Sequence, residues 1–373
     1  MTSKVYFTDF HTKMGTSVPD KLEKLIKTAG ISDIDFNRKF VAIKIHFGEL
    51  GNMAYLRPNF AKRVVDVLKN LGGKPFLTDC STLYVGARKN ALDHLDAAYE
   101  NGYSPFSTGC QVIIADGLKG TDEAVVPLNG TECVKEAKIG RAIMDADVVI
   151  SLNHFKGHEL TGFGGAVKNI GMGAASRAGK MEQHQSGTPT IDSKICAKCR
   201  GCAKVCAQNA IEYDSKGIAR INLNKCVGCG RCIGVCNFDA ISNSNWNANE
   251  LLCKKMAEYA LAVLQERPQF HINIVNQVSP YCDCHAENDI PIIPDVGMFA
   301  SFDPVALDRA CADMCNKQPV IAESVLAKNL EKKHADCCDH FGNSMPDTHW
   351  QDCLEHAEKI GLGTQKYELI TVK

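Results

Sequence analysis

The sequence predicts an α/β fold, in which a mostly parallel sheet carries helices on both faces and is interrupted by a small cysteine-rich insert. Short β-branched runs alternate with helical patterns through the first half of the chain. The alternation stops over about 190–247 and then returns. Strands separated by helices of this length imply right-handed crossovers between parallel neighbours, so we expect helices on both faces of the sheet.

The first half supplies four strands and three helices. The helical pattern is clearest in 59–71, where Phe60, Val64 and Leu68 recur on one face and a glycine pair follows as a stop signal. The β-branched run FVAIKIHF indicates a buried strand. We expect strands at 40–47, 75–79, 111–116 and 147–153, and helices at about 88–101, 59–71 and 133–144.

The second half resumes the same pattern after the insert. Asp303 is a helix N-cap and Pro304 suits the first helical position, so a helix is expected over 303–315. Because α/β patterning flanks the insert on both sides, we expect residues 1–189 and 248–373 to form one core domain around an inserted domain at 190–247. The other elements expected are helices at 250–266 and about 350–360, and strands at 271–276 and 367–372.

The composition indicates a soluble globular protein. Of the 373 residues, 45% are hydrophobic and 23% are charged, and the formal net charge is −1. That balance gives no electrostatic field that would recruit nucleic acid or an anionic membrane, so we expect neither as a partner.

The 19 cysteines indicate a reducing compartment, where thiols bind metals rather than pair. The first residues, MTSKVYFTDFHTKMG, have no long apolar run and no small-residue cleavage site. No stretch approaches the roughly 18 uninterrupted apolar residues of a membrane helix. We therefore expect a cytoplasmic protein, of an oxygen-poor cytoplasm.

Eight of the cysteines form two copies of one spacing. In KICAKCRGCAKVCAQNA (194–210) and KCVGCGRCIGVCNFDA (225–240), the cysteines are separated by two, two and three residues. Three thiolates at this interval can wrap one corner of a four-iron cluster and leave its last iron for a distant ligand. The spacing closely matches bacterial two-cluster ferredoxins, in which the fourth cysteine of each run ligates the other cluster.

This resemblance implies a ferredoxin-like insert of α+β type with two [4Fe–4S] clusters. Ferredoxins usually have proline after the fourth cysteine, whereas this chain has Ala207 and Asn237, which affects loop rigidity and potential rather than ligation. Structural zinc is the alternative, but a zinc knuckle has no role for the third and fourth cysteines. The resemblance assigns one cluster to Cys196, Cys199, Cys202 and Cys236, and the other to Cys226, Cys229, Cys232 and Cys206.

Polar residues gather where the core strands end. Parallel α/β sheets bind ligands at the carboxyl ends of their strands, and Lys44, Glu49, Asp79 and Asp116 lie at such ends. Turn chemistry or a structural hydrogen bond is the alternative for each residue alone. We expect a ligand site here. Its expected catalytic residues are His46, His154, Lys156, His158 and Lys168.

A glycine-rich segment, LTGFGGAVKNIGMG (160–173), follows the histidines. Exposed amides at a helix start, with a lysine in the first turn, make an anion site. A flavin or another anionic ligand would fit, although neither a Walker loop nor a dinucleotide fingerprint is present; close packing is the alternative. The cofactor-binding residues expected here are Gly162, Gly164, Gly165 and Asn169.

Two further cysteines, Cys282 and Cys284, lie in SPYCDCHAEND. Alternate residues of an extended segment face the same side, so the two thiols can share one metal ion, with help from His285 or Asp283. Two unmodified thiols in a reducing cytoplasm are the equal alternative.

Together these motifs resemble the family called domain of unknown function 362, in its members from anaerobic bacteria and archaea that contain a ferredoxin domain. The resemblance rests on IHFGE (45–49), HFKGHELTGFGGAVKNIGMG (154–173), CDCHAENDIPIIPDVGMFASFDPVALDRA (282–310) and the double cysteine motif. It covers most of the chain and implies a shared fold and clusters, but the name of the family assigns no activity.

Our leading hypothesis is an iron–sulfur oxidoreductase. The insert would pass low-potential electrons between a redox partner protein and a small-molecule substrate, flavin or metal at the sheet edge. The alternative is a non-catalytic electron carrier or redox sensor that binds partner proteins. The sequence does not specify the oligomeric state.

Overall fold

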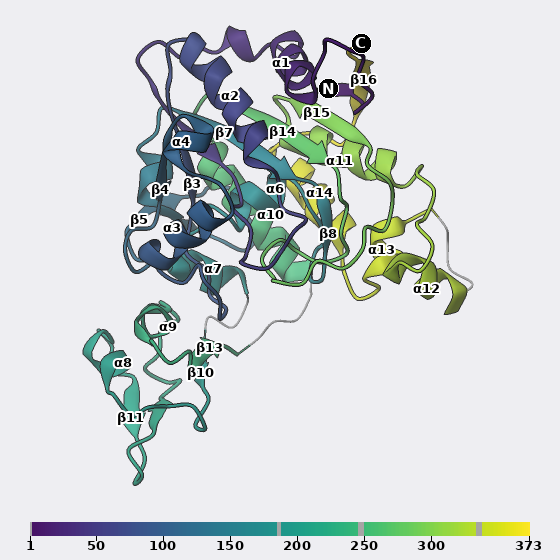
Figure 1. The fold of residues 1–373 in the computed structure, drawn as a ribbon. Coiled ribbons are helices and arrows are strands. Elements are labelled where there is room, and N and C mark those ends of the chain that lie inside the picture. The colour runs from purple at the N-terminus through teal and green to yellow at the C-terminus, as the bar shows by residue number, and fades with distance from the viewer. Residues whose placement is uncertain (1, 185–187, 245–249, 333–337) are drawn as a thin grey trace.

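A computed structural model of the chain describes residues 2–184, 188–244, 250–332 and 338–373. The core is built on an eight-stranded sheet with the strand order β16-β1-β15-β14-β7-β2-β3-β4 (Figure 1). The strands of this sheet are β1 (Ser3–Thr8), β2 (Phe40–Lys44), β3 (Lys74–Asp79), β4 (Gln111–Ile114), β7 (Val148–His154), β14 (Gln269–Val275), β15 (Gly297–Ser301) and β16 (Tyr367–Thr371).

The sheet is mostly parallel, which confirms the predicted fold class. Strand β15 runs antiparallel to its neighbours β1 and β14, and the remaining neighbours are parallel. The carboxyl ends of β2, β3 and β7 therefore meet at one edge, as the sequence predicted.

Helices cover both faces of the sheet. Successive residues of β7 enter opposite cores, because Val149 packs with one set of helices and Ile150 with the other. None of the helices in the described ranges is long and apolar enough to cross a membrane. One face carries α1 (Val18–Thr28), α2 (Pro58–Asn70) and α3 (Ala91–Glu100), and the other α6 (Ala166–Gly171), α10 (Glu250–Leu264), α11 (Pro304–Cys315) and α14 (Trp350–Lys359).

Shorter helices complete the core. Helix α7 (Arg177–Gln183) begins at the N-cap Ser176, whose hydroxyl accepts from the amide of Gly179. The predicted N-cap of α11 is confirmed, because the carboxylate of Asp303 accepts from two amides of its first turn. The others are η1 (Ile31–Asp33), α4 (Pro105–Thr108), α5 (Arg141–Met144), α12 (Val325–Lys332) and α13 (His340–Ser344).

The helix predicted at 133–144 is wrong. The chain forms a hairpin there, in which β5 (Glu123–Pro127) pairs antiparallel with β6 (Glu136–Gly140), and only α5 is helical. Within β6, Ala137 and Ile139 are buried whereas Lys138 is less so, which is the two-residue period of a strand.

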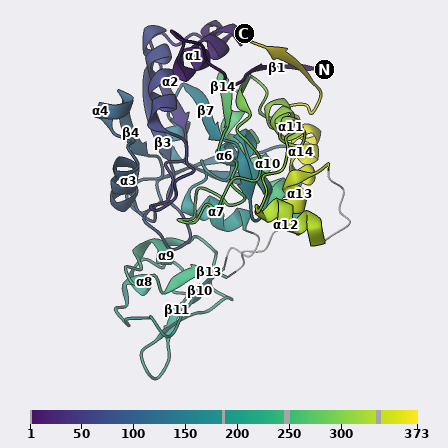
Figure 2. The same cartoon turned by 45° about the vertical axis from the view of Figure 1, so that its right-hand side comes forward.

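The cysteine-rich insert is closed at its base by its own entry and exit strands. Strand β10 (Pro189–Ile191) pairs antiparallel with β13 (Ile241–Asn243). Both views show the unit between them projecting from the core beneath α7 (Figures 1 and 2). The predicted boundary at 247 lies outside the described residues. Its other elements are α8 (Gly201–Lys204), β11 (Ile211–Tyr213), β12 (Ala219–Ile221) and α9 (Arg231–Val235).

Candidate functional site

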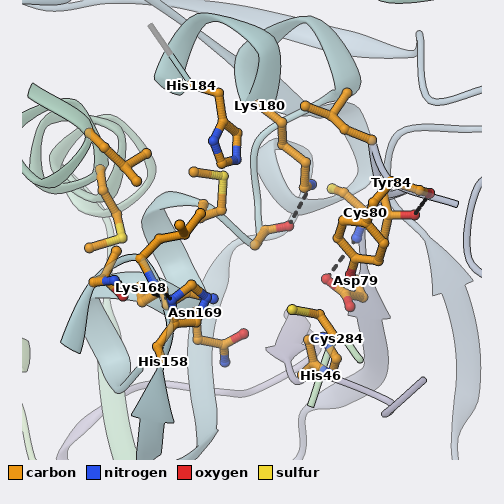
Figure 3. Close-up of a pocket in the computed structure, with 18 of the residues that line it drawn as sticks. His46, Asp79, Cys80, Tyr84, His158, Lys168, Asn169, Lys180, His184 and Cys284 are labelled. Carbon is orange, nitrogen blue, oxygen red and sulfur yellow. Dashed lines mark hydrogen bonds between the residues drawn. The ribbon is translucent and has the colours of Figure 1, made fainter. Parts of the chain in front are cut away.

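A cavity of about 440 Å³ lies at the carboxyl edge of the sheet. Strand β3 ends at it with Asp79, and β8 (Lys156–His158), which follows β7, contributes His158. Figure 3 shows His158 and Lys168 on one wall, across from Asp79 and Tyr84. The loop after β3 also supplies Leu83 and Arg88, and helices α6 and α7 supply Asn169 and Lys180.

Of the residues predicted as catalytic or cofactor-binding, four line the cavity: His46, His158, Lys168 and Asn169. They come from segments far apart in the sequence, and the sheet edge brings them together. His154 and Lys156 are buried beside the cavity rather than in its lining. The catalytic and cofactor-binding roles of these residues stay predictions.

His154 holds the turn that carries the C-x-C cysteines. Its Nδ1 lies 2.9 Å from the carboxylate of Asp283 and its Nε2 lies 2.7 Å from the carbonyl oxygen of Asn276. Both ring nitrogens are thus taken by protein oxygens, and His154 contacts the C-x-C turn through Asp283. The carboxylate of Asp283 therefore faces His154, whereas the sequence analysis named Asp283 as a candidate metal ligand.

The glycine-rich turn opens a short helix as predicted, but its amides are already occupied. The amides of Ala166 and Val167 donate to the carboxylate of Asp308 at 2.7 and 2.9 Å. A Cβ on Gly165 would lie 2.2 Å from Asp308 Oδ1, so this glycine admits the carboxylate. The prediction that these amides bind an external anion is therefore corrected, because Asp308 is the anion they bind.

Two other glycines of the turn serve close packing. Gly162 has φ +74°, and a Cβ there would lie 2.9 Å from Trp350. A Cβ on Gly164 would lie 2.9 Å from Lys156 Nζ. Neither glycine contributes to the lining of the cavity, whereas Asn169 does.

The C-x-C cysteines occupy a tight turn, closed by the bond from the His285 amide to the Cys282 carbonyl at 3.1 Å. Cys282 is buried, and Cys284 reaches the cavity. Lys156 Nζ and Lys168 Nζ lie 3.4 and 3.6 Å from the Sγ of Cys282. The site therefore places two ammonium groups around one buried sulfur.

The groups around this turn shift the pKa values of its two thiols in opposite directions. Burial alone would raise the pKa of Cys282, but a hydrogen bond with Cys284 and the ammonium groups of Lys156 and Lys168 outweigh it and hold that pKa well below its usual value. The same hydrogen bond, with burial, raises the pKa of Cys284 well above its usual value. Cys282 is thus the thiolate of the pair, and Cys284 is the thiol.

The same side chains can hold a metal ion. Ligand atoms of His158, Cys282 and Cys284 lie within 4.8 Å of one another, and so do those of Glu159, Cys284 and His285. Thiolate and imidazole ligands suit zinc or iron. However, the Nδ1 of His158 accepts from the amides of Leu160 and Thr161 at 3.0 and 3.3 Å, so a neutral His158 carries its proton on Nε2.

Several lining residues were missed from the sequence. Arg88 is buried, with its Nε 3.1 Å from Glu49 and its Nη1 2.9 Å from the Nε2 of His46. It belongs to the irregular loop after β3, which has no hydrophobic period. Only its position after the end of a strand could have predicted Arg88 at the ligand site. Other missed lining residues include Leu83, Tyr84, Glu159, Lys180 and His184.

The residues at the other strand ends have separate roles. Lys44 Nζ lies 2.9 Å from Asp79 Oδ1 and 2.6 Å from Asn169 Oδ1, which ties β2 to β3 and α6. Burial favours the neutral form of Asp79, but Lys44 and neighbouring cations hold its pKa below the usual value. Asp116 accepts from the amide and hydroxyl of Ser81 and does not line the cavity.

The eight repeated cysteines surround two further cavities, and all are free of disulfides. One, of about 230 Å³, is lined by three cysteines of the second run and the last of the first: Cys226, Cys229, Cys232 and Cys206. The other is lined by Cys196, Cys199, Cys202 and Cys236. The second cavity is narrower, about 20 Å³, so its side chains would have to move outward to admit a cluster. The donor chemistry of four thiols around each space fits an iron–sulfur cluster.

The backbone repeats along with the cysteines. Left-handed φ values occur at Lys198 and Arg200 in the first run, and at Gly228 and Gly230 in the matching positions of the second. The amide of Ala210 donates to the Sγ of Cys206 at 3.2 Å. Turns of this kind direct amides inward, which suits an anionic group.

The insert and the cavity share a boundary. Leu83 lines the cavity and also belongs to the apolar cluster that contains Met181, Cys232 and Ile233. Lys89 Nζ donates to the carbonyl oxygen of Cys236 at 3.2 Å. The loop after β3 is therefore one wall of the cavity on one side and a support of the insert on the other.

Arg177 of α7 forms a second contact between core and insert. Its guanidinium donates to the carbonyl oxygens of Lys89 and Lys119 in the core. A Cβ on Gly234 of α9 would lie 1.6 Å from Arg177 Nη1, and one on Gly230 would lie 2.9 Å from its Cγ. These two glycines therefore make room for Arg177, whereas the sequence indicated only space around a cluster.

A family model described as "Domain of unknown function (DUF362)" matches residues 41–313. No curated protein matches the chain. A crystal structure of a protein from Thermotoga maritima is 13% identical, over 83% of this chain and 59% of that chain, with a TM-score of 0.43. The lactate racemase apoprotein from Thermoanaerobacterium thermosaccharolyticum is 9% identical, over 99% of this chain and 83% of that one, with a TM-score of 0.41.

Proposed function

The chain belongs to the DUF362 family, whose name assigns no activity, and we propose that it is an iron–sulfur oxidoreductase. In this proposal the insert binds two [4Fe–4S] clusters and exchanges low-potential electrons with a ligand in the sheet-edge cavity. The proposal rests on the thiol chemistry of the insert and on its contact with that cavity.

The observation that carries the proposal is the crossed grouping of the cysteines. Each cavity of the insert is lined by three cysteines of one run and the last cysteine of the other. Two-cluster ferredoxins divide their ligands in this way. A pair of independent zinc knuckles would instead use the cysteines of each run together.

The shared wall supports electron exchange between the insert and the cavity. Cys232 and Leu83 belong to one apolar cluster, and Leu83 lines the cavity. A cluster bound by Cys232 would therefore be close to the ligand site. Exposed Cys199 lies in the other set, so the second cluster would face solvent and a redox partner protein.

The cavity lining indicates the class of ligand. Lys168 and Lys180 provide positive charge at two separate places in the lining. Leu160, Met172 and Met256 provide apolar surface. A small molecule with an apolar body and an anionic group fits both, and a flavin is one example of that chemistry.

Iron and sulfide analysis of anaerobically reconstituted protein tests the proposal. We expect about eight irons per chain, and clusters that accept electrons from a low-potential reductant. About four irons or fewer after full reconstitution, or clusters that stay oxidised, would contradict it. Zinc in place of iron would do the same.

A non-catalytic carrier or sensor is distinguished by a variant in the cavity. His158→Ala lies outside the insert, so the iron content should be unchanged. If the protein is an oxidoreductase, this variant should lose electron transfer to a cavity ligand. If it is a carrier, electron transfer to a partner protein should be unaffected by the variant.

A further inference from the structure

We propose that Cys282 and Cys284 are a redox-active dithiol that cycles between two thiols and a disulfide. This inference rests on the proposed function, since the clusters of the insert would supply its electrons. It also names the chemical class of the substrate in the sheet-edge cavity, which is a small-molecule disulfide.

The geometry of the turn suits a disulfide. The two cysteines are separated by one residue in a turn closed by the His285 amide, and their sulfurs lie within 4.8 Å of each other. Disulfides require Cα atoms about 4.4–6.8 Å apart, a range that a turn of this kind allows. A small rotation of the side chains would bring the sulfurs into bonding distance.

The surroundings favour a dithiol over a metal ion. Lys156 Nζ and Lys168 Nζ occupy positions around Cys282 that a cation or its other ligands would need. The Nδ1 of His158 accepts two backbone amides, which leaves the proton on the nitrogen that would have to bind the metal. Positive charge fixed by protein groups stabilises a thiolate, which is the reduced form of the pair.

The resetting step balances in atoms and charge. The sulfur–sulfur bond breaks, two electrons enter, Cys284 takes one proton, and Cys282 becomes a thiolate beside its lysines. Two [4Fe–4S] clusters held by the eight cysteines of the insert would supply one electron each, which together make the electron pair that a disulfide requires.

The oxidising step is exchange with a small-molecule disulfide in the cavity. Cys284, whose side chain lines the cavity, passes its proton to the Cys282 thiolate through their hydrogen bond and attacks one sulfur of this substrate as a thiolate. The released substrate thiolate then takes that proton from Cys282 and leaves as a thiol. The Cys282 thiolate then attacks the Sγ of Cys284 and displaces the second substrate thiolate. The net reaction is reduction of the substrate disulfide by two electrons and one proton.

The loop after β3 supplies a direct connection. Leu83 packs in the apolar cluster with Cys232, and the next residue, Tyr84, stacks on His285 of the C-x-C turn with ring centroids 6.2 Å apart. The two adjacent residues thus contact the insert and the dithiol turn.

Peptide mapping tests the dithiol. The anaerobic holoprotein is treated with hydroxyethyl disulfide, quenched in acid, blocked with N-ethylmaleimide and digested with trypsin. Within residues 256–309, the tryptic peptide that carries the pair, Cys282 and Cys284 are the only cysteines. We expect this peptide to lose two hydrogens and to escape blocking. The peptide 310–317, with buried Cys311 and Cys315, is the internal control and should be fully blocked.

Reductive titration tests the source of the electrons. After oxidation, wild-type protein should take up two electrons more than Cys282→Ser, whose insert is unchanged. Dithiothreitol should reduce the disulfide without the clusters and serves as the control.

The outcomes separate the two proposals. A peptide 256–309 that keeps two free thiols, or a zinc ion that is lost in Cys282→Ser, overturns the dithiol while the cluster titration still decides the proposed function. A disulfide that forms and is reduced by dithiothreitol, but never by reduced clusters, supports the dithiol and overturns the clusters as its source of electrons, while iron analysis and the cluster titration still decide the proposed function.

Discussion

The ammonium group of Lys156 lies 3.4 Å from the sulfur of Cys282, and both side chains are buried. Burial opposes the charged form of each group. Nearby negative groups, led by Cys282, outweigh it and raise the pKa of Lys156, while the hydrogen bond with Cys284 and the charge of Lys156 outweigh it and lower the pKa of Cys282. The pair is thus an ammonium and a thiolate that stabilise each other away from water.

Replacing this lysine should move the titration of the thiol. Since thiolate is lost as the pH falls through the pKa, Lys156→Met should lose it at a higher pH than wild type, with a pKa higher by about 1–3 units. The measurement is thiolate ultraviolet absorbance against pH, taken as the difference from Cys282→Ser. Lys138→Met, which removes a partly exposed partner of Glu182, is the matched control and should titrate like wild type. Coinciding curves for the two lysine variants would show that Lys156 does not stabilise the thiolate.

The ligand grouping of the insert predicts which pairs of cysteines act together. Under crossed ligation, Cys206→Ala with Cys226→Ala damages one cluster, and about four of roughly eight irons should remain. Cys206→Ala with Cys196→Ala damages both, and almost no iron should remain. Iron and sulfide analysis distinguishes the two double variants.

Uncrossed ligation predicts the opposite result, because each run would then hold its own cluster. Cys338→Ala is the control, since this exposed cysteine lies outside both cavities. Its iron content should equal that of wild type.

The sequence was sufficient for the parts of the molecule that follow a local rule. Alternating strands and helices predicted the sheet, and reading the strand ends predicted His46, His158 and Lys168 at one cavity. The capping chemistry of Asp303 predicted the start of α11. Each of these depends on neighbours in the chain or on the fold class alone.

The rest depends on contacts between distant segments. Nothing near Arg88 or Lys180 indicates that an irregular loop and a short helix fold over the same strand ends. The role of Gly165 was misread for the same reason: a glycine beside a helix start suits an external anion, but the anion is Asp308, from a helix more than a hundred residues later. Hydrophobic period also failed at 133–144, where a short hairpin has too few residues to show a clear period.

Arg177 should control the attachment of the insert. Its guanidinium donates to the buried carbonyl oxygen of Lys89 and to the partly buried one of Lys119, and it lies against Gly230 and Gly234. In Arg177→Met both carbonyls lose their donor, which costs about 1–3 kcal/mol for a buried group and less for a partly buried one. Hydrogen exchange should therefore show α9 amides opening with a free energy about 2–4 kcal/mol lower, while β7 amides are unchanged. Arg220→Met, an exposed arginine of the insert paired with Asp214, should leave α9 protected.

The helix that carries Lys168 and Asn169 should depend on Asp308. That carboxylate accepts from the amides of Ala166 and Val167 and, at 2.8 Å, from the side-chain amide of Asn273, all of them buried. Asp308→Ala leaves three donors without an acceptor, so the free energy of unfolding should fall by about 3–5 kcal/mol.

Denaturant unfolding measures this loss, and a second variant gives its cause. Asp308→Asn keeps one acceptor oxygen and should lose less stability than Asp308→Ala. Asp313→Ala, on the same helix but partly exposed, should cost less than about 1 kcal/mol. Equal losses in Asp308→Ala and Asp308→Asn would mean that the negative charge, rather than the number of acceptors, holds the start of α6.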